Sequence, residues 1–104
     1  MNKADENAVS QNKLVLRPLI GLMRGQAPEE IEHFVIDEIK KHRRLRDDAV
    51  RLEKSLEEAK ECTQLDARRA YITAMIAVHA QQTVVSTLLD ILGYIPNGAE
   101  ESVH

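Results

Sequence analysis

Residues 67–92, ARRAYITAMIAVHAQQTVVSTLLDIL, decide the fold of this 104-residue chain. Apolar and small side chains recur here at alternating spacings of four and three residues, which is typical of a helix that packs along one side. The recurring positions are Ala67, Tyr71, Ala74, Val78, Gln81, Val85, Leu88 and Leu92. Gly93 suits a left-handed helix end, and Pro96 blocks any continuation. The stretch therefore predicts one long helix that ends near Leu92.

A second helical pattern precedes this stretch, over residues 28–61. Pro28 suits a first helical turn, and the acidic residues after it are favoured by the helix dipole. Its inward-facing positions are Ile31, Val35, Ile39, His42, Leu45, Ala49, Leu52, Leu56 and Ala59. Residues 62–66 form so short a connection that the two helices should lie antiparallel, with Thr63 or Asp66 capping the second one.

The N-terminal part of the chain lacks a long helical pattern. Residues 13–27 are apolar and contain a proline that can begin a short helix and a glycine that can end one. This segment is too apolar to remain in water, so we expect it to pack on this chain or on a partner. Residues 1–12 are polar and lack periodicity, so we expect a disordered tail there, and residues 97–104 form a polar C-terminal tail. This leaves a single helical-hairpin domain of residues 13–96.

The stretch of residues 67–92 carries more apolar surface than one neighbouring helix can cover. A helix in a two-helix hairpin buries one stripe, and a second stripe needs a second neighbour, either residues 13–27 or another copy of the chain. We therefore expect an all-α antiparallel hairpin of long helices, with a short N-terminal helical segment, that dimerises into a four-helix bundle. The expected dimer interface comprises Ile72, Met75, Ile76, Val84 and Leu89.

The sequence indicates no site of catalysis or metal binding. The histidines and the single cysteine lack the spacing of a metal site, and phosphate-loop and nucleophile-elbow motifs are absent from the sequence. We therefore expect neither enzymatic activity nor a cofactor. One cysteine, Cys62, cannot form an internal disulfide and fits a reducing cytoplasm. We see neither a signal peptide nor an apolar run of membrane-spanning length.

A basic string, KKHRRLR at residues 40–46, suggests a nucleic-acid site when it is read linearly. On a helix with His42 and Leu45 turned inward, its five cations spread around the exposed positions. Acidic residues follow, and the formal net charge of −3 argues against general nucleic-acid binding. We prefer a solvated face with some docking role. A small helical nucleic-acid-binding protein and a structural adaptor remain the alternatives.

Polar residues interrupt the inward-facing positions of both helices, His42 on the first and Gln81 on the second. Polar residues at such positions often fix register or partner choice, although an ordinary hydrogen-bonded pair explains them equally well. Glu38 lies four residues before His42 and could contact it along the helix.

Short motifs run in order along residues 16–96. They are Leu16-Arg17-Pro18-Leu19-Ile20-Gly21-Leu22, Arg24-Gly25, Ile36-Asp37 with Ile39, His42-Arg43-Arg44-Leu45, Tyr71-Ile72, Ala74, Ile76, His79-Ala80-Gln81 and Ile91-Leu92-Gly93-Tyr94-Ile95-Pro96. Each motif is weak alone. Together, at these spacings, they resemble the TraM-type antiactivators of bacterial quorum sensing.

The resemblance implies a cytoplasmic dimer of helical hairpins from rhizobial bacteria, often encoded on a plasmid. Members of this family bind TraR, a LuxR-type activator that responds to an acyl-homoserine lactone, on its C-terminal DNA-binding domain. Binding keeps TraR from its promoter sites, so that conjugative-transfer genes stay off. The resemblance thus implies a transcriptional antiactivator without catalytic residues, cofactor, or direct contact with nucleic acid or membrane.

The expected partner-binding residues combine the motif matches with the chemistry of their segments. They are Arg17, Pro18, Leu19, Arg24, His42, Arg43, Arg44, Leu56 and Tyr71. Leu56 and Tyr71 flank the hairpin turn, and an aromatic side chain with a polar tip is a frequent interface anchor. Packing within the core or the dimer is the alternative role for the apolar members, and surface salt bridging is the alternative for the cationic ones.

Overall fold

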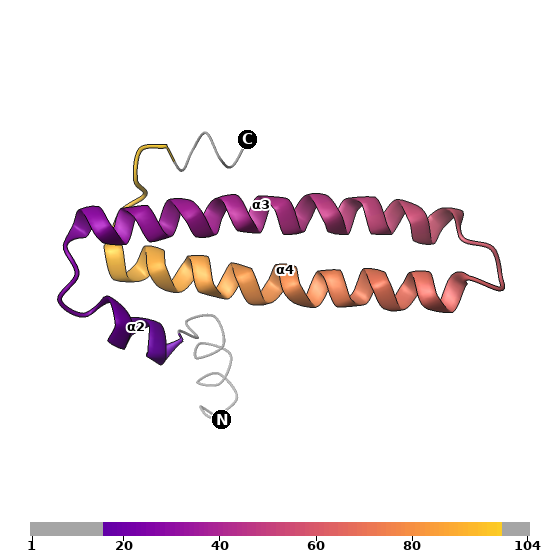
Figure 1. Ribbon diagram of the computed structural model, residues 1–104, viewed down its shortest axis with the longest axis horizontal. Helices are drawn as coiled ribbons and strands as arrows, with labels where there is room; N and C mark the ends of the chain where they lie inside the picture. The colour runs from indigo at the N-terminus through magenta and orange to yellow at the C-terminus, as the bar shows by residue number, and fades with distance from the viewer. Residues whose placement is uncertain (1–15, 99–104) are drawn as a thin grey trace, which may run out of the picture.

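The computed structural model describes residues 16–98, and this part of the chain is helical without strands. Its helices are α2 (Arg17–Met23), α3 (Pro28–Glu58) and α4 (Gln64–Leu92). Figure 1 shows α3 and α4 side by side and antiparallel, with α2 against α4 near one end. The predicted all-α hairpin with a short N-terminal helix is confirmed. We call the end that carries the turn between α3 and α4 the closed end, and the other the open end.

The closed end begins three residues earlier than the sequence pattern predicts, because α3 ends at Glu58 rather than at residue 61. Ala59 has an extended backbone with ψ of 141°, which stops the helix. Thr63 occupies the N-cap position of α4. Its hydroxyl donates a hydrogen bond to the Lys60 carbonyl at 3.2 Å instead of capping the helix, so it stabilises the turn.

The end of α4 follows the prediction closely. Gly93 adopts a left-handed conformation with φ of 89°, and its N–H donates to the Leu89 carbonyl at 2.8 Å. The chain then lies against the first turns of α3, where the Tyr94 hydroxyl donates to a Glu32 carboxylate oxygen and Pro96 is fully buried. The hydrogen bond to Glu32 raises the pKa of Tyr94 above its usual value. Residues 93–98 therefore strap the open end.

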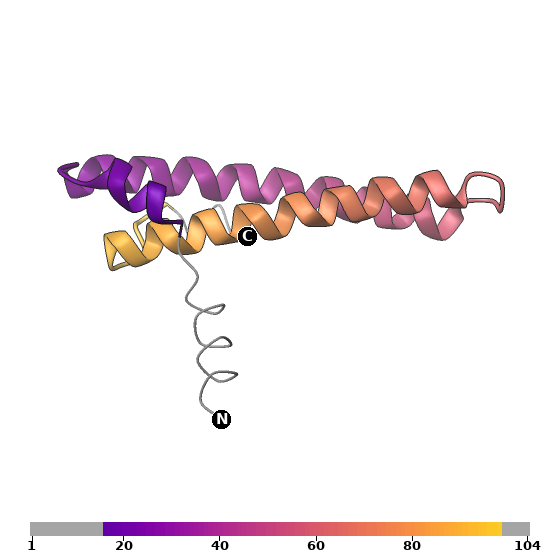
Figure 2. The same cartoon turned by 90° about the horizontal axis from the view of Figure 1, so that it is seen from below.

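Helix α2 packs on the same end from the side of α4 (Figure 2). Pro18 lies in its first turn, as the sequence predicts. The Leu16 N–H donates to the hydroxyl of Thr87 at 3.3 Å, and Leu19 and Met23 pack against the core. This chain thus covers part of the apolar N-terminal segment, while Leu22 stays 65% exposed.

The core lies at the open end. Its buried members are Ile31, Val35, Ile39 and Leu88, and partly buried neighbours include Val84 and Leu89. Ala49 and Val78 are buried farther towards the closed end. Because α2 packs on this core and residues 93–98 lie against the first turns of α3, the open half of the hairpin has additional cover, whereas the closed half consists of two helices alone.

Most of the two expected tails lies outside the residues that the structure describes. The N-terminal tail, residues 1–12, lies outside the described part, as do residues 99–104 of the C-terminal tail. The first residues of that second tail are described. A Cβ atom added at Gly98 would lie 3.9 Å from Cδ1 of Ile36, so Gly98 approaches α3 closely.

Helix α4 is long and apolar enough to cross a membrane by length and composition, with a mean hydropathy of 1.3 over 18 residues. The sequence analysis missed this, because polar side chains interrupt the apolar ones. Only 22% of that window is buried within the chain. Core helices of soluble proteins can be equally long and apolar, so this property of α4 is weak evidence for a membrane span. Its uncovered apolar surface is the more informative feature.

Candidate protein-interaction surface

A groove of about 210 Å³ lies between α3 and α4 in the closed half of the hairpin. The residues that line it are Arg46, Ala49, Val50 and Glu53 from α3, and Tyr71, Met75 and Val78 from α4. Ala49 and Val78 are buried and form part of its floor, and Val50 is 66% exposed beside them. Arg46 and Glu53 are exposed, which gives an apolar groove one cation and one anion. Apolar surface framed by charge is typical of protein-interaction sites.

A stripe of exposed apolar side chains continues this surface along α4. Leu65, Ile72 and Ile76 are 59%, 49% and 65% exposed. Farther along the helix, Thr87 is fully buried and bonded to the start of α2. In Figures 1 and 2, α2 lies against the open half of α4 and leaves its closed half bare. The closed half of α4 therefore offers apolar surface to a partner, whereas α2 covers the open half.

The structure places the nine expected partner-binding residues in three regions. Arg17, Pro18 and Arg24 are exposed on or beside α2 at the open end, and Leu19 packs against the core. The other five lie on the long helices. His42, Arg43 and Arg44 lie near the middle of α3, and the half-buried Leu56 and Tyr71 lie in the closed half. Only Tyr71 lines the groove.

The five expected dimer-interface residues divide into two groups. Ile72 and Ile76 are exposed, and Met75 is half-buried in the groove. Val84 and Leu89 are half-buried because they pack against the core of their own chain. Met75 and Tyr71 line the same groove, although the sequence assigned them to different partners.

Sequence reasoning missed Val50 and Glu53 as groove residues. Both lie beside the inward-facing positions of α3, and Arg46, Val50 and Glu53 follow one another at spacings of four and three residues. This spacing places them on one face of the helix, next to the buried seam. The signal for them in the sequence is therefore a second helical stripe on α3, like the second apolar stripe of residues 67–92.

A polar layer crosses the α3–α4 interface near its middle. It consists of Glu38, His42 and Gln81, with the exposed His79 beside them on α4. Gln81 is 6% exposed, and its Nε2 donates to the Glu38 carbonyl at 3.1 Å and to the Glu38 carboxylate at 2.5 Å. Glu38 therefore contacts the opposite helix rather than His42.

The imidazole of His42 stands apart within the polar layer. Its Nδ1 atom is buried and has no hydrogen-bond partner. Burial first, and then the nearby charges of Arg46 and His79, lower the pKa of His42 below its usual value of 6.5. His42 is therefore held in its neutral form near pH 7.

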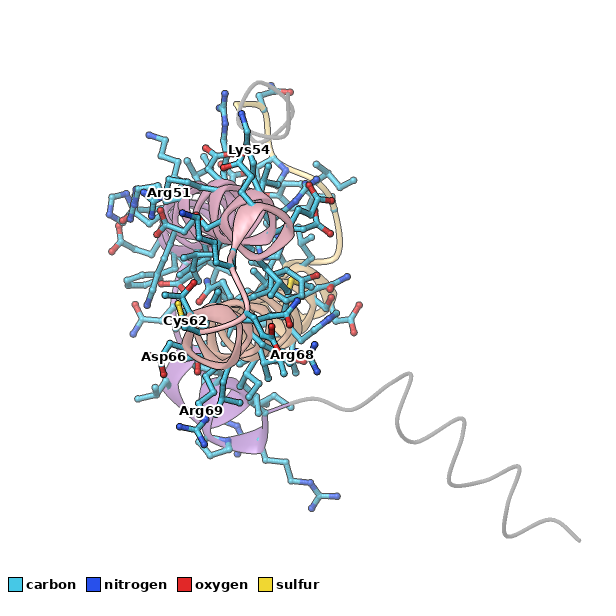
Figure 3. All side chains as sticks on the ribbon, turned by 90° about the vertical axis from the view of Figure 1, so that its right-hand side faces the viewer. Arg51, Lys54, Cys62, Asp66, Arg68 and Arg69 are labelled. Carbon is cyan, nitrogen blue, oxygen red and sulfur yellow. The ribbon has the colours of Figure 1, made fainter. Side chains whose placement is uncertain are left out.

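The basic string behaves as the helix geometry predicts. Lys40, Lys41, Arg43, Arg44 and Arg46 are all exposed, while His42 and Leu45 are half-buried. Figure 3, which looks at the closed end, shows further cations around the turn, namely Arg51 and Lys54 on one side and Arg68 and Arg69 on the other. Arg51 donates to the carboxylate of Asp48 at 3.0 Å. This end therefore carries both cations and anions, including Asp66 at the start of α4.

Chemistry-bearing side chains do not converge within residues 16–98. No three histidine, cysteine, aspartate or glutamate residues gather there to hold a metal ion. Cys62 is a free thiol, exposed at the closed end (Figure 3).

Comparison with known proteins confirms the expected resemblance. A family model described as Prokaryotic Transcriptional repressor TraM matches residues 1–97. The Transcriptional repressor TraM of Agrobacterium fabrum is 45% identical over 95 residues, which cover 88% of this chain and 93% of that protein. The protein of the same name from Rhizobium radiobacter is 43% identical over 94 residues, covering 88% and 92%.

Proposed function

Because the chain belongs to the TraM family of prokaryotic transcriptional repressors, we propose that it represses transcription as an antiactivator, by binding an activator protein. The proposed activator is TraR, a quorum-sensing regulator of the LuxR type, contacted on its C-terminal DNA-binding domain. The complex would keep TraR from its promoter DNA and conjugative-transfer genes off. On this proposal the chain works in the cytoplasm and is neither an enzyme nor the holder of a cofactor.

The uncovered groove of the closed half is the observation that carries this proposal. It offers Tyr71 and Met75 from one helix, and Val50 from the other, to a partner. Aromatic and methionine side chains are enriched at the centres of interfaces, and burying each can contribute about 1.5–3 kcal/mol. Charged side chains at the groove would orient the partner rather than add much affinity.

A second copy of the chain is proposed for the remaining apolar surface. The hairpin leaves Ile72 and Ile76 exposed on the closed half of α4. Two hairpins that join these faces would form a four-helix bundle with a continuous apolar centre. The groove and the α4 stripe adjoin each other, so the dimer would set the shape of the surface that the activator meets.

A gel shift with TraR, its acyl-homoserine lactone and promoter DNA tests the proposal. Titrating in the purified protein should remove the TraR–DNA band, while a lane with this protein and DNA alone should show no shift. A shift in that control lane would favour the nucleic-acid alternative through Lys40, Lys41, Arg43, Arg44 and Arg46. Unchanged bands in both lanes would leave only the adaptor alternative.

Tyr71→Ala is expected to weaken TraR binding, because it removes the aromatic side chain from the groove. The loss should be at least about tenfold in Kd, in the range of an interface anchor. Binding is measured by titration calorimetry, with circular dichroism as the check on folding. Ile95→Ala is the control, since Ile95 is 64% exposed at the open end and away from the groove. Loss of helicity in Tyr71→Ala would assign Tyr71 to the core instead.

A further inference from the structure

The polar layer contains a buried imidazole nitrogen, Nδ1 of His42, with no acceptor for a hydrogen bond. A neutral imidazole has one N–H and one lone pair, whereas the imidazolium cation carries an N–H on both nitrogens. The Nδ1 of His42 is buried and has no partner. In the neutral tautomer with its hydrogen on Nε2, only a lone pair is buried there. Protonation would bury an unpaired N–H donor, at a cost comparable to that of a lost hydrogen bond.

The charged groups around His42 oppose protonation. Arg46 lies one turn further along α3, and His79 lies on α4. Both disfavour a positive charge on His42. Glu38, one turn back on α3, is the nearest acidic candidate for a compensating partner. Its carboxylate accepts the hydrogen bond from Gln81, which fixes it towards α4. Thus the one anion of the polar layer already has a partner.

We propose that the hairpin is acid-sensitive at its middle, where a proton taken up by His42 weakens the pairing of α3 with α4. The folded state binds this proton less readily than the unfolded chain, in which histidine titrates near 6.5. The stabilisation is therefore complete above about pH 6.5 and is lost progressively as the pH falls below it. This inference stands on the hairpin alone and is independent of the identity of the activator.

Urea unfolding at pH 7.5 and pH 5.5, at one protein concentration, tests it with the whole chain. A histidine that is protonated only in the unfolded state lowers the folding equilibrium constant by at most about tenfold between these values. We expect the wild type to lose several-fold and His42→Gln to lose clearly less. His33→Gln is the matched control, because His33 is exposed and pairs only with Asp37 along α3, at 3.3 Å. It should keep the wild-type pH dependence.

Two further measurements keep the test decisive if His42→Gln folds poorly. His42→Leu, an apolar replacement, should flatten the pH dependence in the same way. In the wild type, an NMR titration of the histidine ring signals should show the pKa of His42 below its usual value of 6.5. Equal pH dependence in the wild type and both His42 variants would overturn the proposal. So would a His42 that titrates at or above 6.5 in the folded protein.

Discussion

At the scale of single residues, the contact between Gln81 and Glu38 joins the two long helices through hydrogen bonds. Gln81 is almost fully buried, and its amide reaches both the backbone and the side chain of Glu38. Apolar side chains can slide past one another at modest cost, but these two hydrogen bonds fit a single relative position of α3 and α4. Buried polar contacts of this kind can fix register between helices.

Gln81→Leu should destabilise the chain by about 1–3 kcal/mol, because the half-buried Glu38 carboxylate loses its donor and the Glu38 carbonyl keeps only its hydrogen bond within the helix. Urea unfolding measured by circular dichroism gives the difference. Glu38→Gln is the control, since its side-chain oxygen can still accept the bond from Gln81. If Gln81→Leu proved as stable as the wild type, the hydrogen bonds would contribute nothing beyond the apolar contacts around them.

The sequence predicted which polar residues face inward, but not which residues they contact. The periodicity placed His42 and Gln81 inward, as the structure does, yet it offered Glu38 to His42. The partner depends on how far α3 is displaced along α4, and that displacement is set by the turn. Because the turn begins at Ala59 and not at Cys62, no spacing within one helix could have shown which residue faces Gln81.

At the scale of secondary-structure elements, two glycines should respond oppositely to the same substitution. Gly93→Ala forces a side chain into a left-handed backbone and should cost about 1 kcal/mol. Gly21 lies inside α2 with open space around its Cβ position, so Gly21→Ala should stabilise by about 0.5–1 kcal/mol. Thermal unfolding of both variants checks this. A stabilising Gly93→Ala would mean that the end of α4 can rearrange freely.

Element boundaries were predictable where a residue imposes its own backbone geometry. Pro18 and Pro28 mark the starts of α2 and α3, and Gly93 marks the end of α4, as expected. The end of α3 lacks such a residue. Its last turns are rich in glutamate, which favours helix throughout, so the sequence alone extended α3 to residue 61.

At the scale of the whole molecule, the proposed dimer makes Ile76 and Ile95 unequal. The two side chains are 65% and 64% exposed in the single chain. Ile76→Asp should weaken self-association at least about thirtyfold, because burying a carboxylate costs about 2 kcal/mol or more. Ile95→Asp, at the open end, should have little effect.

Sedimentation equilibrium over a range of concentrations measures this difference. The wild-type dimer should also persist when salt is raised, since apolar burial rather than charge would hold it together. A wild type that is monomeric at micromolar concentration, or equal association of the two variants, would contradict the proposed bundle.

The hairpin itself could be predicted because two strong seven-residue patterns and one short connection leave few alternatives. The interaction surface could be predicted only in part. Tyr71 and Ile72 stand out in the sequence, but Val50 contributes to the groove only because the pairing of α3 with α4 brings it to the same groove as Met75. The strap of residues 93–98 was also missed, since a single buried proline after a helix gives no periodic signal.

The unequal closure of the two ends has a consequence for how the molecule moves. Separating α3 from α4 at the open end must also release α2, the core around Val35 and the segment that contains Pro96. Separating them at the turn disrupts two helices only. Local opening is easiest where buried contacts are few, so transient unfolding should start at the turn and travel inward. The groove then lies in the half of the hairpin that opens most easily. The helices around it would become more ordered when a partner binds there.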